Sequence, residues 1–338
     1  MSVIAAALAH PTTATPLRPP NSLRRTSHID MSFDDSGTGP RLWLRGRARD
    51  LFTDADHQGR VVAEAEVNAG LDEAHRLQTL TTTPHQPGLD SLHGRVVGGG
   101  FRAALHQQIG ASHAVRTPLY LLLDDLPVAA LISGYTQLYR WGLGEIEPPD
   151  RGGETSMLKA DICSGWRRDG TMMVHLRAGG RFPAPVGPPA PALAGAEDPL
   201  AWHRVDDLAP GGMRRRRLVE VTRGDPLRPL RVHAMFRDSH RGSDDIETVL
   251  HEYTVDAEVD PDTLVVLDCE ATPRTLPWAE CPAAAASAGR LRGQPVEGLR
   301  DFVRRELSGT TTCTHLNDLL RSLADVASLA TALRGLAA

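Results

Sequence analysis

Alternating apolar and polar positions mark strands in the first part of the chain. Residues 27–33 and 41–52 alternate as single strands, and residues 60–80 alternate as a strand pair with a turn. From residue 117 to 139 the apolar positions instead recur at the spacing of a helix. The pattern therefore predicts a strand-rich region followed by helices.

The same order of elements returns in the second half of the chain at a slowly drifting offset. Ala48-Arg49-Asp50 resembles Phe236-Arg237-Asp238, 188 residues later, and Arg116-Thr117-Pro118-Leu119 resembles Cys313-Thr314-His315-Leu316, 197 residues later. We therefore predict an α+β protein made of two tandem copies of an antiparallel sheet packed by helices, arranged as a pseudo-dimer.

The composition along the chain suggests four regions. Residues 1–22 are rich in Ala, Thr and Pro, which predicts a disordered leader. Residues 23–141 form the first copy, with a scaffold role, and residues 142–211 form a Pro/Gly-rich, mostly extended connector. Residues 212–338 form the second copy, which carries the candidate site.

The repeat also locates the start of a helix. Pro118 suits the first helical position, where its missing N–H group is no loss, so the equivalent His315 should lie in a first turn as well. We expect a helix from Thr314 onward, capped by Thr314 or Thr312. Cys313 would then lie at the positive end of the helix dipole, which favours a thiolate.

Charge and apolar content exclude several classes of partner. The 37 basic and 42 acidic residues give a net charge of −5, which does not support a general nucleic-acid binder or a protein bound to anionic membranes. No apolar run reaches the length of a membrane span, and no secretory leader is recognisable. We therefore expect a cytoplasmic protein that recognises a small molecule, either as a monomer with a pseudo-twofold axis or as a homodimer.

The four cysteines do not indicate a disulfide framework in a chain of this length and compartment. Free thiols and metal ligands remain as interpretations. Cys163 and Cys269 have no histidine or cysteine partners in the sequence pattern, so we interpret both as structural. Cys281 and Cys313, taken singly, would also most often be small buried apolar residues.

Two further charged segments have simple structural interpretations. The basic run Arg214–Arg217 is interpreted as a solvated strand start, and Asp124-Asp125 as the exposed side of a helix with ion pairs. Gly98-Gly99-Gly100 lacks the spacing and the lysine of a phosphate loop, so it predicts a turn. We expect no nucleotide cofactor.

Several short segments between about residue 212 and 330 form a recognisable set. They are Arg214–Arg217, Phe236-Arg237-Asp238, His251-Glu252, Cys281-Pro282, Leu291-Arg292-Gly293 and Cys313-Thr314-His315-Leu316. In these segments the chain resembles the domain of unknown function 2889 family. The family form has a Gly before the motif cysteine and an Asp after the strand histidine, where this chain has Thr312 and Glu252. The resemblance brings no activity with it.

A more distant similarity is to the NifU-like iron–sulfur scaffold proteins. These proteins also run from antiparallel strands into helices, with metal ligands on a strand, before an Ala-rich helix and near the last helix. The similarity is one of order and spacing, and it implies ligands at His251, Cys281 and the Cys313/His315 pair. The first ligand departs from the pattern, because it is a histidine and not a cysteine.

Two thiols and two imidazoles are a ligand set for a tetrahedral zinc site or a mixed iron site. His251, Cys281, Cys313 and His315 are therefore the predicted metal ligands. A core histidine or a buried thiol would explain each residue alone. The first copy has Ala63, Arg116 and Pro118 at three of the equivalent positions, and this one-sided pattern favours a site in the second copy.

These residues support three functional hypotheses. The leading one is an enzyme of lyase, cyclase or hydrolase type that acts on a small organic molecule, with zinc or iron as Lewis acid or water activator and Glu252 as general base. The second is a metal or iron–sulfur carrier without turnover. The third is a metal-free enzyme in which Cys313 is the nucleophile.

Overall fold

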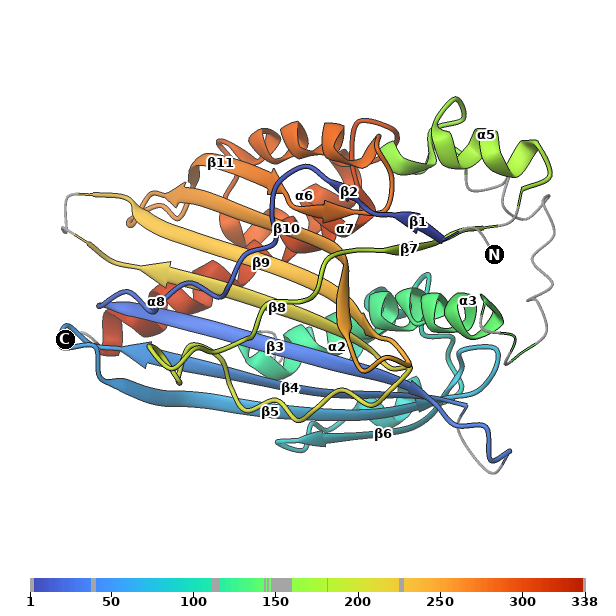
Figure 1. The fold of residues 1–338 in the computed structure, drawn as a ribbon. Coiled ribbons are helices and arrows are strands. Elements are labelled where there is room, and N and C mark those ends of the chain that lie inside the picture. Colours follow the sequence, from blue (N-terminus) through green and yellow to red (C-terminus); the bar gives the residue numbers. More distant parts are fainter. Residues whose placement is uncertain are drawn as a thin grey trace.

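An eight-stranded antiparallel sheet forms the centre of the protein in a computed structural model (Figure 1). The structure describes residues 3–37, 41–110, 116–142, 144, 146, 160–180, 182–224 and 228–336. The strand order is β11-β10-β9-β8-β3-β4-β5-β6. The strands are β3 Ser22–Phe33, β4 Leu42–Thr53, β5 Gly59–Leu71, β6 Leu77–Thr83, β8 Met213–Thr222, β9 Leu230–Arg241, β10 Glu247–Val259 and β11 Val266–Pro273.

Two four-stranded meanders make up this sheet. Strands β3 to β6 pair in sequence order, strands β8 to β11 do the same, and β3 pairs with β8 in the middle. The predicted α+β class is confirmed. The strands predicted from alternation in the first half are also present, because a period-two pattern fits a pleated sheet.

Helices cover one face of the sheet (Figure 1). They bury two apolar clusters, one under each set of helices, around Phe101 and Leu122 in the first half and around Tyr253 and Leu319 in the second. The helices on this face are η1 Leu89–Leu92, α1 Phe101–Ile109, α2 Pro118–Ile132, α3 Gly134–Gly142, η4 Cys281–Leu291, η5 Val296–Gly298, α6 Leu299–Glu306, α7 Thr314–Ser322, η6 Leu323–Asp325 and α8 Val326–Leu336, where η denotes a 3-10 helix.

Two extended segments cross the opposite face of the sheet, one before β3 and one before β8 (Figure 1). Arg24 donates to carbonyl groups of both segments, including Leu17 and Ala201. His28 contacts His203 of the second segment, while Ile29 packs on the helix side. The central strands are therefore buried on both faces.

The predicted disordered leader is wrong for residues 3–21. Strand β1 Val3–Ala5 pairs with β7 Ala184–Val186, and β2 Ala7–Leu8 pairs with β12 Thr275–Leu276. Arg18 also binds Asp198, with Nε 2.9 Å from Oδ1. A Pro-rich segment cannot form a core of its own, but here backbone pairing and ion pairs with the rest of the chain hold it in place.

The connector is only partly extended. It contains η3 Ser164–Trp166 and α5 Thr171–Arg177 in addition to β7. The structured piece predicted around Met157 to Met173 lies partly outside the described residues, which resume at residue 160.

The basic run at the start of β8 is buried, so its interpretation as a solvated strand start is wrong. Each of the four residues Arg214–Arg217 is at most 3% exposed. Arg217 binds Asp125 of α2 and Asp318 of α7, each through Nη2 at 2.7 Å. Asp124 and Asp125 are therefore also buried, because β8 is a central strand and the helices supply its countercharges.

One helical stretch, Pro118–Gly142, has the length and hydropathy of a membrane span. Of its apolar window, 78% is buried inside the protein. This is the pattern of a core helix packed on β3, β4 and β5. It is weak support for a membrane location.

Candidate metal centre

Three charged or ionisable side chains lie in a row across neighbouring strands. Arg215 of β8 is paired in register with Asp238 of β9, which is paired with His251 of β10. Directly opposed residues of antiparallel strands point to the same face, here the helix side. The β9–β10 ladder shifts between Val249 and His251, and this bulge sets which face His251 occupies.

Helix α7 places a second imidazole over this row. His315 is the second residue of the helix, and its ring stacks on that of His251 with centroids 3.9 Å apart. One ligand atom from each of Asp238, His251 and His315 can be chosen so that all three lie within 4.8 Å of one another. Two nearly parallel imidazoles and a carboxylate thus bring possible ligand atoms close together.

His251 has polar atoms that the protein leaves unsatisfied. The residue is fully buried, and neither ring nitrogen has a hydrogen-bond partner among the described residues. Nδ1 lies 3.3 Å from Oδ2 of Asp238, but this contact is not aligned as a hydrogen bond. Buried imidazole nitrogens are nearly always paired, so the two ring nitrogens of His251 favour an additional ligand at this position.

The protonation states of the site suit a cation. Burial alone would raise the pKa of Asp238, but Arg215, His251 and His315 together outweigh it and hold this pKa below its usual value. Desolvation lowers the pKa of His315 to about 3, and the adjacent His251 adds to that shift. A carboxylate and a neutral imidazole are the forms that bind metal ions.

The structure brings together two of the four predicted metal ligands. His251 and His315 meet, whereas no cysteine belongs to a group of three close ligand atoms among the described residues. Cys281 and Cys313 instead lie near Tyr253, whose hydroxyl donates to the carbonyl of Cys281 at 3.1 Å. The predicted set of two thiols and two imidazoles is therefore corrected to two imidazoles and Asp238.

The expected thiolate at Cys313 is also wrong. Burial, with a smaller contribution from the neighbouring Cys163, raises the pKa of Cys313 to about 11. Burial likewise raises the pKa of Cys281 well above its usual value. Although Cys313 is at the start of α7, the loss of water outweighs the helix dipole.

We therefore expect the native protein to resist alkylation. Iodoacetamide at neutral pH should modify its thiols much more slowly than those of the urea-unfolded chain, since all four cysteines are buried. Mass spectrometry over time measures this. A native thiol that reacts as fast as a free cysteine would restore the nucleophile hypothesis.

Glu252 is not placed to act as a general base at this centre. It follows His251 in β10, so its side chain points to the opposite face of the sheet. There it accepts a hydrogen bond from Nε of Arg237 at 2.8 Å and from the backbone N–H of Thr13 at 3.0 Å. Its role is to bind the N-terminal segment.

The helix predicted from Thr314 onward is confirmed, with His315 in its first turn. The predicted threonine cap is wrong, because Cys313 occupies the N-cap position and makes no side-chain cap hydrogen bond.

Thr314 is exposed, so its replacement should have little effect on stability. We expect Thr314→Ala to change the free energy of unfolding by less than about 0.5 kcal/mol. Urea denaturation measures the change. A loss of about 1 kcal/mol would instead indicate a capping threonine.

Aromatic residues surround the buried imidazole. The ring of Tyr135 meets that of His251 edge-on, with centroids 5.6 Å apart, and Phe182 contacts Tyr135. Trp166 and Trp278 continue this group around Phe182. The surroundings are apolar, which strengthens electrostatic interactions at the centre.

Asp238 belongs to this group of possible metal ligands but was not among the residues predicted from the sequence. It lies within Phe236-Arg237-Asp238, in the repeat and in the family resemblance, but carboxylates on strands most often form ion pairs. The register that opposes Asp238 to His251 is a property of the folded sheet. The repeated Arg-Asp pattern was the available signal.

Comparison with known proteins gives one match. No curated protein and no solved structure matches the chain, so the similarity to NifU-like scaffold proteins is not supported. Residues 213–329 match the family described as Protein of unknown function (DUF2889), and this region contains Asp238, His251 and His315.

Proposed function

We propose that this protein is a metal-dependent enzyme acting on a small organic molecule, with the metal ion held by Asp238, His251 and His315. The observation that carries the proposal is the fully buried His251, whose two ring nitrogens have no hydrogen-bond partner among the described residues. Its Nδ1 lies 3.3 Å from Oδ2 of Asp238. A metal ion would satisfy one of these nitrogens and explain why a carboxylate and a second imidazole converge there.

Three protein ligands favour a catalytic ion over a purely structural one. Structural zinc sites use four protein ligands, whereas catalytic sites use three and leave a position for water or substrate. Two histidines and one carboxylate suit zinc and ferrous iron. Such an ion would polarise a carbonyl group or lower the pKa of a bound water.

Arg215 would position the carboxylate ligand. Its Nη1 lies 2.8 and 3.0 Å from the two oxygens of Asp238, and its Nη2 binds Asp318 at 2.6 Å. This contact keeps Asp238 ionised and fixes its rotamer. Groups that orient a ligand in this way tune metal affinity without touching the ion.

We also propose that the two meanders are copies of one unit, of which only the second carries the site. Asp50 pairs with Ala63 at a β-bulge, and Asp238 pairs with His251 at a β-bulge 188 residues later. A second pair of bulges recurs at the same spacing. The first half keeps a carboxylate, Asp50, but has Ala63 at the position equivalent to His251, which agrees with a scaffold role.

Cobalt binding tests the open coordination position. Co²⁺ added to metal-free protein should give a visible absorption spectrum, and azide should change this spectrum because it can occupy the open position. His315→Gln should abolish the spectrum.

His203→Gln is a matched control, since His203 belongs to another buried histidine pair, with Nε2 2.7 Å from Nδ1 of His28 on the opposite face. It should leave the cobalt spectrum unchanged. A spectrum that azide does not alter would favour a carrier with a closed site, and no cobalt binding would refute the proposal.

A further inference from the structure

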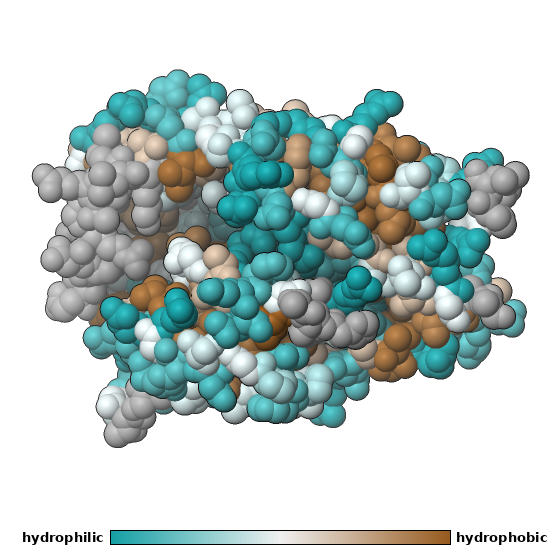
Figure 2. All heavy atoms as spheres, turned by 180° about the vertical axis from the view of Figure 1, so that it is seen from behind, coloured by the Kyte–Doolittle hydropathy of each residue, from teal (hydrophilic) through white to brown (hydrophobic). Residues whose placement is uncertain are grey.

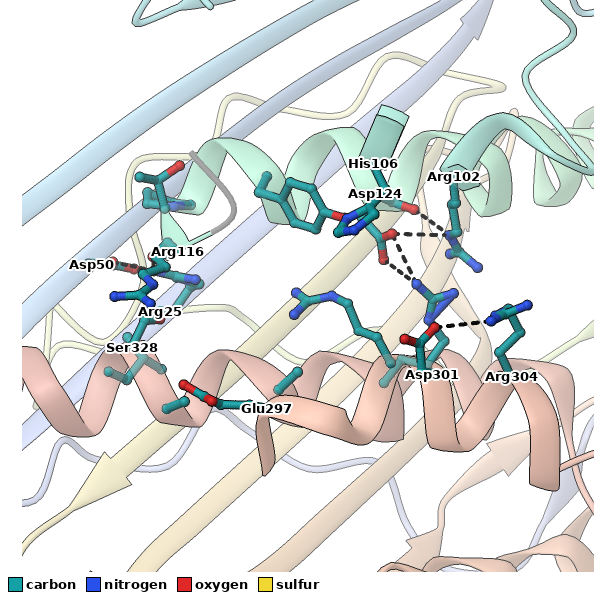
Figure 3. Close-up of a pocket in the computed structure, with 18 of the residues that line it drawn as sticks. Arg25, Asp50, Arg102, His106, Arg116, Asp124, Glu297, Asp301, Arg304 and Ser328 are labelled. Atoms are coloured by element: carbon teal, nitrogen blue, oxygen red, sulfur yellow. Dashed lines mark hydrogen bonds and ion pairs between the residues drawn. The ribbon is translucent and has the colours of Figure 1, made fainter. Parts of the chain in front are cut away.

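A large pocket lies on the helix-covered side, between the helices of the two halves (Figure 3). Residues of α1 and α2 line one side, residues of α6 and α8 line the other, and Arg25 and Asp50 lie at its base. Its volume is about 1180 Å³. None of Asp238, His251 and His315 lines it, so it is a second candidate site.

Ten of the residues that line this pocket are charged. Six arginines and four carboxylates line it, and the arginines come from both halves of the chain. Figure 2 shows the same face of the molecule, with hydrophilic side chains gathered across its middle. The arginines are Arg25, Arg102, Arg116, Arg300, Arg304 and Arg321.

Two of these arginines have an unpaired Nε atom among the described residues although they form ion pairs. Arg300 binds Asp325 and Arg321 binds Asp124, in each case through Nη2. The Nε atom of each is buried and has no hydrogen-bond partner among the described residues. The carboxylates therefore hold these guanidinium groups in place without using all their N–H groups, which favours an additional acceptor.

Arg116 is less constrained than the others. Its side chain is exposed and has no ion pair or hydrogen bond with any described residue. It lies beside Arg25 and Asp50 at one end of the pocket (Figure 3). It can therefore turn toward a ligand at little cost to the fold.

Two helix N-termini border the same pocket. Gly98 to Gly100 lead into the nine-residue α1, and Thr117 and Pro118 open the fifteen-residue α2. The N-terminus of a helix carries a partial positive charge and free N–H groups. Both helix ends add to the field of the arginines.

We infer that this pocket binds a small organic anion carrying phosphate or carboxylate groups. The Nε atoms of Arg300 and Arg321 have no hydrogen-bond partner among the described residues, and the charge of Arg116 has no ion-pair partner among them. The two helix ends also favour negative charge. Arginine recognises both kinds of oxyanion through two parallel hydrogen bonds. The volume is large enough for an organic molecule and exceeds that needed for a free inorganic ion.

Calorimetry with two probes tests this inference. Inorganic pyrophosphate and tricarballylate are titrated separately into the full-length protein, after the protein has been treated with a chelator and dialysed, so that neither probe reports on bound metal. At least one probe should bind saturably. Arg116→Gln should weaken that binding by about tenfold or more, because it removes a charged hydrogen-bond donor.

Arg95→Gln is the matched control, because Arg95 is exposed in the same half and does not line the pocket. It should leave binding unchanged, and thermal unfolding should show both variants to be folded. Binding of pyrophosphate alone assigns a phosphate ligand, and binding of tricarballylate alone assigns a carboxylate ligand. If neither probe binds, or if Arg116→Gln weakens binding no more than Arg95→Gln does, the inference is wrong.

Discussion

Asp318→Asn should lower the free energy of unfolding by about 3–5 kcal/mol, because it leaves buried arginines without their shared countercharge. The carboxylate of Asp318 binds Arg102, Arg215 and Arg217 at 2.5 to 2.7 Å, and its own side chain is 3% exposed. Asparagine keeps the shape of the side chain but not its charge. Urea denaturation of the two proteins measures the difference.

Asp301→Asn provides the comparison, since Asp301 pairs with Arg304 at the surface. This exposed ion pair should contribute less than about 1 kcal/mol. If both substitutions had equally small effects, the buried charges in the middle of the sheet would not stabilise the fold.

The contribution of Asp318 should depend on pH. The surrounding arginines outweigh burial and hold the pKa of Asp318 well below its usual value. Its stabilisation is therefore complete above the unfolded pKa of about 4 and is lost as the pH falls toward the folded pKa. The difference in stability between wild type and Asp318→Asn should shrink below about pH 4 and stay constant near neutrality.

His251→Gln should reduce zinc affinity by at least about 100-fold, a larger loss than changes beyond the ligands usually cause. Glutamine occupies a similar volume but replaces the imidazole nitrogen with an amide, a poor zinc ligand. Competition with a fluorescent chelator measures the affinity. Cys281→Ala serves as the control, and it should leave zinc affinity unchanged because its thiol is not part of the group.

A zinc affinity that falls for Cys281→Ala and not for His251→Gln would reverse this assignment. That result would support Cys281 and Cys313 as metal ligands, as the sequence motif predicts.

Local pattern was sufficient to predict much of the fold. Alternation located the strands of the first half, and the offset of 188 residues anticipated a second strand-rich region. The burial of Arg214–Arg217 could not be predicted, because a run of arginines has the composition of a surface strand. They are buried because β8 is a central strand, with helices on one face of the sheet and an extended segment on the other.

The candidate site was half predicted, for a related reason. His251 and His315 were selected because the motif placed an imidazole on a strand and another at a helix start, and both placements are confirmed. Asp238 depended on the register between β9 and β10, which the sequence does not display. The thiols were overvalued because burial, which raises the pKa of Cys313, is a tertiary property.

Metal content is the most direct test of the central claim. Protein expressed without a histidine tag and dialysed is analysed for zinc and iron by mass spectrometry of the elements, beside Asp238→Asn prepared in the same way and shown to be folded by circular dichroism. The account predicts about one ion for each wild-type chain and almost none for the variant. Wild-type protein that neither contains nor takes up zinc or iron, or a folded variant that retains the full amount, would contradict it.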